Sequence, residues 1–259
     1  MIKFENTVWP SADQWKAIIF GARNPLNSWD RSDSEFNREV RHYFDENDMP
    51  CTDLRKFVIG SNDLGLMNRL RNAGTDHRKF MRMITVYVDI TAPLYWWKEF
   101  DTYKVGTVAN SCSTMHKIAD KEFALDDFSH EHLFKADDVG SMYYSATAEE
   151  ELTSTDVLMI VIEALNVARN KYNEASKKLK RTDLTEAERK HVMAQKKLFW
   201  WQMIQLLPSS YNQKRTVMLN YEVLTNMYRS RKSHKLDEWH VFCDWIKTLP
   251  YSELITGDK

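Results

Sequence analysis

The chain has 259 residues, of which only 7 are Gly and 6 are Pro, a composition that argues against an all-β sandwich and favours a helix-rich fold. Its formal net charge is −1, so no overall electrostatic field draws it to nucleic acid or to an anionic membrane. The cysteines, Cys51, Cys112 and Cys243, lie far apart and are odd in number, which argues against a disulfide framework or a CxxC metal site. With no signal-peptide pattern at the start and no apolar run long enough for a bilayer, we expect a cytoplasmic protein with neither nucleic acid nor membrane as a partner.

The first part of the chain contains signals for two helices separated by a long loop. Ser11 and Gln14 have the spacing of a capping box, which predicts a helix over 11–19. A polar loop rich in turn-forming residues is expected over 21–34. A second helix is predicted over 64–73, because Gly follows its last residue.

The clearest strand signal is the sequence from Arg82 to Ile90. Apolar residues occupy every second position: Ile84, Val86, Val88 and Ile90. This alternation predicts a half-buried strand, and Pro93 is expected to close it. The residues after the strand, 92–104, are rich in aromatic side chains and predict a helix.

Two long helices are predicted after an acidic and irregular stretch over 119–155. The first begins at Thr155 and has one apolar face. This face comprises Val157, Ile160, Val161, Ala164, Leu165, Ala168 and Tyr172. A second capping box, Thr185 with Glu188, begins the next helix, which ends at Pro208, so an extended helical hairpin occupies about 155–207. With a last helix over 236–249, the elements predict a helix-rich α+β fold in a single domain, 1–259.

The most informative stretch is Pro208 to Arg231, which we interpret as a core-packed helix. It places Asn220, Asn226 and Arg231 at spacings of six and five residues. Two amides and a guanidinium on one short segment indicate a polar ligand beside it, because a core helix normally carries Leu or Ala at such positions.

Two polar motifs have a simpler interpretation than a ligand site. His130-Glu131-His132, with Asp126 and Asp127, has metal-binding residue types, but a solvated loop explains it better, and we expect no metal. The basic run 178–181 fits a helix C-terminus, because single-stranded nucleic acid binding needs interleaved aromatic residues.

Two further motifs leave alternatives open. Cys112 and His116 are four residues apart and would face each other on a helix, as in a thiolate nucleophile; the alternative is a small buried thiol near a coincidental His. Tyr95, Trp96, Trp97, Phe100 and Tyr103 form an aromatic cluster that suits a helical core or the stacking surface for a flat cofactor. Lys98 and Glu99 lie among these aromatic residues, which favours the wall of a site.

Taken together, these residues resemble the flavin-dependent thymidylate synthases (ThyX) over most of the chain. GTDH, ending at His77, is similar to the family's GHE segment, and Pro93 lies where the family has AP before an aromatic helix. Leu207-Pro208 matches the family's LP. Asn220, Asn226 and Arg231 then fall on two flavin-contacting Asn residues and on the Arg that binds the pyrimidine. Ser233-His234 resembles the SH that follows.

The same resemblance shows a departure in the family signature, RHRxxSxNExSxRY. Here the stretch reads TYKVGTVANSCSTMH, Thr102 to His116. Thr102, Tyr103 and Lys104 replace Arg, His and Arg; Asn110 and Ser113 keep their types; Ser111 replaces Glu and Met115 replaces the late Arg. Ile204 stands in place of a phosphate-binding Arg. Because bidentate guanidinium contacts hold phosphate strongly, nucleotide binding must differ, with Lys98, Lys104, Lys214 and Arg215 as compensating cations.

What the resemblance implies is an enzyme that methylates C5 of a pyrimidine deoxynucleotide, dUMP to dTMP. FAD is the cofactor, and NADPH and methylenetetrahydrofolate are co-substrates. Arg231 is the implied catalytic and pyrimidine-binding residue. The implied cofactor-binding residues are His77, Thr102, Tyr103, Lys104, Asn110, Asn220, Asn226 and His234, and the implied substrate-binding residues are Glu99, Ser111, Ser113 and Arg231. The family assembles as homotetramers with shared active sites.

Three alternatives about function stay open. Glu99 stands where the family has a substrate-contacting Gln, and a carboxylate only accepts hydrogen bonds, which suits the amine of cytosine; in the alternative, Glu99 pairs with a neighbouring Lys. In the first alternative the enzyme methylates a uracil nucleotide. In the second, an enzyme of the same fold acts on a cytosine nucleotide or makes a hydroxymethyl product. The third alternative is a non-catalytic flavin- or nucleotide-binding relative.

Overall fold

The computed structural model describes residues 2–44, 50–135, 138, 143–145 and 150–257. The chain divides into two compact units, and each consists of several segments. One unit, here the hairpin unit, comprises Met1–Lys3, Thr91–Phe100 and Ser111–Arg215. The other, here the helical unit, comprises Phe4–Ile90, Asp101–Asn110 and Thr216–Lys259. No described helix combines the length and the apolar character needed to cross a bilayer.

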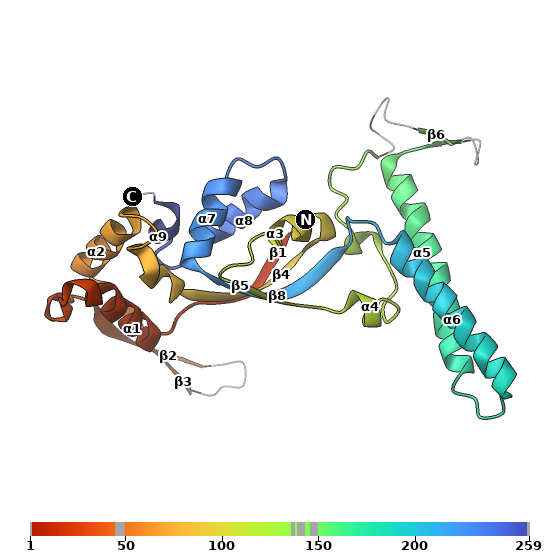
Figure 1. Ribbon diagram of the computed structural model, residues 1–259, viewed down its shortest axis with the longest axis horizontal. Coiled ribbons are helices and arrows are strands. Elements are labelled where there is room, and N and C mark those ends of the chain that lie inside the picture. Colours follow the sequence, from red (N-terminus) through yellow and green to blue (C-terminus); the bar gives the residue numbers. More distant parts are fainter. Residues whose placement is uncertain (1, 45–49, 136–137, 139–142, 146–149, 258–259) are drawn as a thin grey trace. The chain divides into compact units, whose positions relative to one another are not determined.

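The elements follow one another as an α+β chain, labelled in Figure 1. The strands are β1 Lys3–Val8, β2 Glu35–Phe44, β3 Pro50–Val58, β4 Thr85–Pro93, β5 Thr107–Ser111, β6 Tyr143–Ser145, β7 Glu150–Leu152 and β8 Asn212–Asn220. The helices are α1 Ala12–Arg23, α2 Ser61–Asn72, α3 Leu94–Phe100, α4 Thr114–Lys117, α5 Ser154–Lys178, α6 Glu186–Leu206, α7 Tyr221–Arg231, α8 Asp237–Lys247 and α9 Glu253–Thr256. Short 3-10 helices are η1 Asn24–Leu26, η2 Trp29–Arg31, η3 Arg78–Arg82 and η4 Leu125–Asp127. The predicted fold class is confirmed.

A four-stranded antiparallel sheet has the order β1-β4-β8-β5. β4 has the predicted alternation, because Ile84, Val86, Val88 and Ile90 are buried whereas Tyr87 is 49% exposed. Its predicted start at Arg82 is wrong by three residues. The backbone from Arg78 to Arg82 forms η3 instead, where both arginines contact Glu222 of α7. The sheet also includes β8, which the sequence interpretation missed.

The segment 208–231 is not one helix, and that prediction is corrected here. It forms β8 and then α7, joined directly at Asn220. In the second half of β8, Val217 and Leu219 are buried and Thr216 is exposed. Burial at every second residue is the period of a strand. The alternation extends over few residues, and polar side chains precede it, so the pattern is weak in the sequence.

α5 and α6 form the predicted helical hairpin and lie side by side (Figure 1). The buried face of α5 differs from the predicted one: Leu158, Ile162, Leu165, Ala168 and Ala175 are buried, whereas Val157 is 43% and Ile160 is 51% exposed. Apolar residues occur on more than one side of α5, so the sequence period does not select a single face. The buried face of α5 is the one that packs against Phe123 and Phe128 in the hydrophobic core.

The core of the helical unit is built from aromatic residues of α7 and α8. Tyr221, Trp239 and Phe242 are fully buried. The Trp239 and Phe242 rings meet edge to face at 5.4 Å, and Phe4 of β1 stacks on Trp245 at 5.0 Å. The predicted last helix is thus confirmed as α8, and its apolar side fixes α7 beside it.

Candidate functional site

The junction between β8 and α7 is fixed by Asn220. Its side-chain oxygen accepts a hydrogen bond from the backbone N–H of Val223 at 3.0 Å, so Asn220 is the N-cap of α7. Its amide nitrogen faces Gly106, where a Cβ would lie only 2.7 Å away. Gly106 also has φ +84°, a conformation that side chains other than Gly rarely adopt. Asn220 therefore positions the helix and the loop before β5.

Arg231 lies in a pocket of aromatic rings at the other end of α7. Its Nε donates to the Tyr103 hydroxyl at 2.9 Å, and its guanidinium carbon lies 4.7 Å from the Trp239 ring centroid and 5.5 Å from that of Tyr103. Cation–π contacts of this kind hold a guanidinium without neutralising its charge. His234 contacts Trp239 edge to face at 6.3 Å. Three predicted site residues, Tyr103, Arg231 and His234, are thus brought together.

Asn226 belongs to a second polar cluster, which centres on Arg78. Nη2 of Arg78 donates to the Asn226 side-chain oxygen at 3.3 Å, and Nε of Arg78 lies 3.3 Å from a carboxylate oxygen of Glu222. Arg82 binds the same carboxylate. Burial raises the pKa of Glu222, but hydrogen bonds and charge from Arg82 and Arg78 outweigh burial and hold that pKa below its ordinary value. His77 is exposed at the N-terminus of η3.

The two clusters do not share one face of α7. At 3.6 residues per turn, the five residues from Asn226 to Arg231 correspond to a rotation of about 140°. The helix alone therefore does not present Asn226 and Arg231 to a ligand on one face, and the polar ligand predicted beside this segment stays a prediction. Sequence reasoning also missed Arg78, which directly follows His77, Glu222 in the first turn of α7, and Trp239.

The other predicted residues lie on α3 and on the segments that follow it. Thr102 and Lys104 are exposed in the turn after α3, and Asn110 is exposed on β5. In the hairpin unit, Glu99 is half-buried on α3 and Ser111 is exposed at the end of β5. Ser113 is the N-cap of α4 and accepts from the His116 N–H at 3.2 Å.

A cavity of about 220 Å³ lies beside Ser113 in the hairpin unit. Lys214 and Lys117 line it together with Cys112. Lys117 is bound to Asp120 at 2.9 Å, and Lys214, one of the predicted compensating cations, lines the same cavity. Arg215, another predicted cation, lies instead over the Trp97 ring at 4.2 Å.

Two alternative sites lose support. Cys112 precedes the short helix α4 and does not share a helix with His116, so the pairing expected of a helical nucleophile is wrong. Nδ1 of His130 contacts the Phe128 carbonyl at 2.9 Å. Within the described ranges, no three His, Cys, Asp or Glu side chains gather as a metal site.

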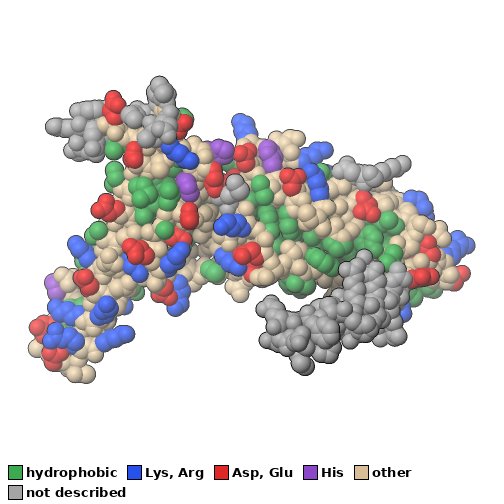
Figure 2. All heavy atoms as spheres, turned by 180° about the vertical axis from the view of Figure 1, so that it is seen from behind, with side chains coloured by type: hydrophobic (Ala, Val, Ile, Leu, Met, Phe, Trp, Pro, Cys, Tyr) green, Lys and Arg blue, Asp and Glu red, His purple; other side chains and the backbone are tan. Residues whose placement is uncertain are grey.

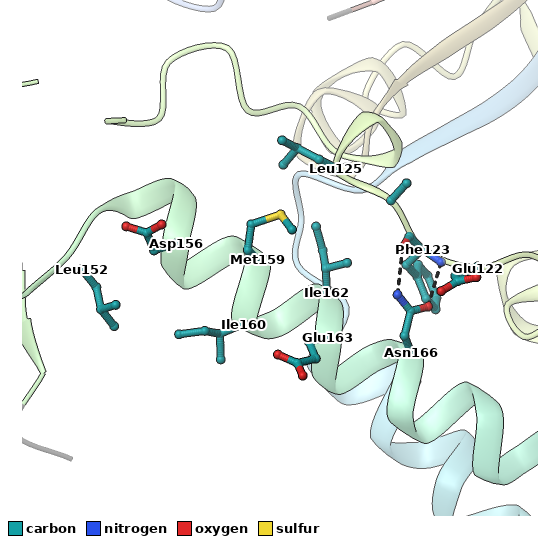
Figure 3. Close-up of a pocket in the computed structure, with 11 residues that line it drawn as sticks. Glu122, Phe123, Leu125, Leu152, Asp156, Met159, Ile160, Ile162, Glu163 and Asn166 are labelled. Carbon is teal, nitrogen blue, oxygen red and sulfur yellow. Dashed lines mark hydrogen bonds between the residues drawn. The ribbon is translucent and has the colours of Figure 1, made fainter. Parts of the chain in front are cut away.

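A larger cavity, about 730 Å³, lies along α5 (Figure 3). It contains none of the predicted site residues. Two of its polar side chains already serve the fold: Asn166 exchanges hydrogen bonds with the Phe123 backbone at 2.9 and 2.8 Å, and Asp156 completes the capping box of α5. Size alone therefore does not identify the candidate site.

The architecture defines a class: the chain has the fold of the flavin-dependent thymidylate synthases. Two solved structures of thymidylate synthase X from Helicobacter pylori, each with FAD and dUMP, are similar to it. The first is 14% identical with a TM-score of 0.55, covering 99% of this chain and 97% of that chain. The second is 15% identical with a TM-score of 0.54, covering 99% and 98%. At these identities the likeness concerns the fold.

A third structure, a UMP/dUMP methylase PolB from Streptomyces cacaoi bound with 5-Br dUMP, is 14% identical with a TM-score of 0.48, covering 99% of this chain and 94% of that chain. No protein-family model and no curated protein sequence matches the chain.

Proposed function

We propose that the protein is a flavin-dependent enzyme that methylates C5 of a pyrimidine deoxynucleotide, converting dUMP to dTMP. The observation that carries the proposal is Arg231, held between Tyr103 and Trp239 on a fold that the structures with FAD and dUMP share along almost their whole length. The residue types at that position suit a reaction that develops negative charge on a pyrimidine ring.

The donor set of the helical unit fits FAD. The pyrimidine edge of an isoalloxazine ring presents carbonyl oxygens and one N–H, and it needs both donors and acceptors. The exposed amide of Asn226 offers both, and His77 is exposed on the element that carries Arg78. When bound and reduced by NADPH, the flavin would supply the hydride that reduces the one-carbon unit brought by methylenetetrahydrofolate.

Arg231 would act as an electrostatic catalyst. A guanidinium keeps its charge at any physiological pH, and oriented positive charge lowers the free energy of a developing anion. The Tyr103 hydroxyl fixes Nε, and the Trp239 face supports the plane of the guanidinium. Tyr103 is therefore a positioning residue, in the place where the family has a His.

The nucleotide phosphate requires a cation that replaces the family arginines. Lys214 is our candidate because it lines a cavity with Ser113, and Lys104 is exposed as a second candidate. Thr102, Asn110, Asn220, Ser111 and His234 remain proposed ligand contacts. Because a lysine offers a point charge and not a bidentate fork, we expect weaker nucleotide binding than arginines would give.

The identity of the base depends on Glu99. As a carboxylate it accepts a hydrogen bond from the exocyclic amine of cytosine, and dCMP is therefore the second candidate substrate. Binding of dUMP and dCMP by the Glu99→Gln variant tests this. If the wild type binds dUMP and ignores dCMP, the cytosine alternative is rejected.

A homotetramer is the proposed assembly. The helical hairpin exposes large apolar side chains, including Met159, Ile160, Leu198 and Trp201 at 40–60%, and burial of such side chains stabilises association. Figure 2 shows Lys and Arg side chains mixed with Asp and Glu side chains at the tip of the same hairpin. Light scattering of the purified protein measures the mass, and a monomer would contradict the proposal.

The decisive experiment combines absorbance and turnover. The purified protein, supplied with FAD, should absorb near ~450 nm, and it should form dTMP from dUMP with methylenetetrahydrofolate and NADPH. Arg231→Ala should lower turnover by about 10²- to 10³-fold, the usual effect of losing one charge-stabilising donor, while FAD stays bound. Arg229→Ala is the control, since Arg229 is exposed on the same helix.

Three outcomes separate the alternatives. A protein that stays colourless with added FAD supports the non-catalytic alternative. A yellow protein that cannot rescue a thymidine auxotroph supports a changed substrate or product. Loss of FAD in Arg231→Ala, with the fold intact, would assign Arg231 to the flavin.

A further inference from the structure

A polar cavity of about 470 Å³ lies in the helical unit, and none of the residues assigned above lines it. The end of α1, the 3-10 helices η1 and η2, and the first turns of α2 form its walls. The lining residues are Arg23, Leu26, Asn27, Ser28, Asp30, Arg31, Asn62, Leu66 and Arg69. Three of them are arginines and one is an acid, so the cavity carries an excess of positive charge.

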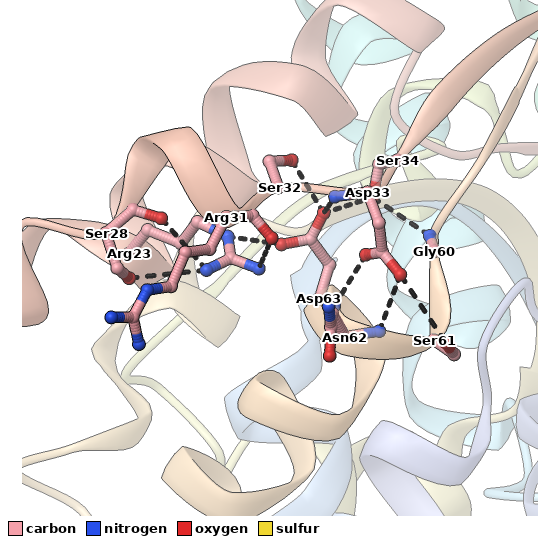
Figure 4. Close-up of polar contacts among 10 residues, drawn as sticks. All are labelled: Arg23, Ser28, Arg31, Ser32, Asp33, Ser34, Gly60, Ser61, Asn62 and Asp63. Carbon is pink, nitrogen blue, oxygen red and sulfur yellow. Dashed lines mark hydrogen bonds and ion pairs between the residues drawn. The ribbon is translucent and has the colours of Figure 1, made fainter.

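The floor of the cavity is a buried and fully paired network, drawn in Figure 4. Nε of Arg23 binds the Asp63 carboxylate, Nη1 donates to the Ser28 carbonyl oxygen at 3.0 Å, and Nη2 donates to the Arg31 carbonyl oxygen at 2.8 Å. Asp63 also accepts from the Ser32 hydroxyl at 2.7 Å. Arg23 is only 3% exposed, so its charge is cancelled by Asp63 and its donors are used.

The other two arginines are not part of this network. In Figure 4 the guanidinium of Arg31 extends away from Asp63 and its partners. Across the described part of the chain, no hydrogen bond or ion pair involves the guanidinium of Arg31 or of Arg69. With Asp30 as the single acid in the lining, one positive charge remains in excess. Asn27 and Asn62 add amide donors.

The rigid framework explains why these side chains surround a cavity and do not collapse into it. Asp33 accepts from the backbone N–H groups of Asn62 at 2.8 Å and Asp63 at 3.0 Å, so it caps the N-terminus of α2 in place of Gly60, which has no side chain. The hydrogen bonds from these N–H groups lower the pKa of Asp33, and they outweigh its slight desolvation, which alone would raise that pKa. Asn27 has φ +46°, which Asn tolerates, and this turns the loop over the cavity.

We propose that this cavity binds the phosphate group of a small molecule. Arg31 and Arg69 supply the planar donor forks that match phosphate oxygens, and the two Asn amides supply neutral donors. The space is larger than one phosphate ion, so a phosphate monoester fits as well as inorganic phosphate. The site is independent of the function proposed above and would stand without it.

The test is an isothermal calorimetric titration of the full-length protein with inorganic phosphate at constant ionic strength. Wild type should bind, and Arg31→Ala or Arg69→Ala should each raise Kd by at least about tenfold, since a hydrogen bond to a charged group contributes that much. Arg31→Lys should retain part of the affinity. Arg181→Ala is the control, because Arg181 is an exposed arginine of the hairpin unit bound to Asp183.

The design distinguishes this site from the proposed nucleotide site. If Lys214 holds the phosphate, binding is lost in Lys214→Ala and kept in Arg31→Ala. If the cavity beside Arg31 holds it, binding is lost in Arg31→Ala and kept in Lys214→Ala. Glycerol 3-phosphate binding more tightly than inorganic phosphate identifies a monoester as the ligand class, and the opposite order identifies the free ion. Acetate binding as tightly as phosphate, or an Arg31→Ala/Arg69→Ala double variant that binds like wild type, would overturn the proposal.

Discussion

Removing the acid of the buried ion pair between Arg23 and Asp63 should strongly destabilise the protein. Their side chains are 4% and 0% exposed. In Asp63→Ala, Arg23 keeps its bonds to backbone carbonyls but loses the carboxylate that neutralises it. An uncompensated buried charge of this kind costs about 3–5 kcal/mol, which raises the unfolded fraction by roughly 10² to 10³-fold or more.

The assay measures the free energy of unfolding in urea for the wild type, the two single variants and the double variant. Trp fluorescence and far-UV circular dichroism should be followed together, because coincident transitions are needed before a free energy is extracted. Arg23→Ala/Asp63→Ala should lose less than the sum of the singles, since the double variant leaves no unpaired charge. Asp244→Ala is the control: Asp244 is 71% exposed beside Lys247, and its loss should fall within the error of the measurement.

Either of two results would refute this reasoning. A loss below about 1 kcal/mol in both single variants would mean that water reaches the pair and screens it. Additive losses in the double variant would mean that each residue stabilises the unit through packing or separate hydrogen bonds and not through their mutual attraction.

Two further predictions concern the proposed site. The lowered pKa of Glu222 means that its pairing stabilises the fold above the ordinary glutamate pKa of about 4.3, and that this contribution is lost as pH falls through the lowered value. Wild type should therefore be more stable than Glu222→Gln near pH 6, with the difference disappearing toward pH 3 in thermal melts; a difference that is equal at both pH values would contradict this. Gly106→Ala should destabilise by about 1–3 kcal/mol through φ strain and more than Gly74→Ala, because only at Gly106 does the new Cβ meet a neighbour. Equal melting temperatures for the two variants would show that Asn220 moves aside freely.

The sequence predicted a helix or strand well where the apolar residues of a segment followed a single periodicity. β4 was found because apolar residues occupy every second position, and the α5–α6 hairpin because an apolar face indicated the first helix and the capping box of Thr185 and Glu188 marked the start of the second. α5 shows the limit: apolar residues such as Val157 and Ile160 lie outside the buried face. Only the neighbouring core selects which side is covered, and a single sequence does not contain that information.

The site was predicted in part, for a related reason. Arg231, Tyr103 and His234 came from fixed spacings, and the structure brings them together. Arg78 and Glu222 were missed because their pairing joins residues 144 apart, and no local pattern indicates such a contact. β8 was missed because its polar first half hides a short alternation.

The direct passage from β8 into α7 restricts how this chain can change its length. With Asn220 ending the strand and capping the helix, one residue added or deleted there would rotate α7 by about 100° and carry Arg231 away from the Tyr103 hydroxyl. Divergence at this junction must therefore proceed by replacement of side chains. In the turn at 101–106, Thr102 and Lys104 are exposed and are not under this restriction, whereas Tyr103 contacts Arg231 and Gly106 lies against Asn220. That difference accounts for a chain in which the spacing from the LP motif to Arg231 resembles the family while the arginines of the signature are gone.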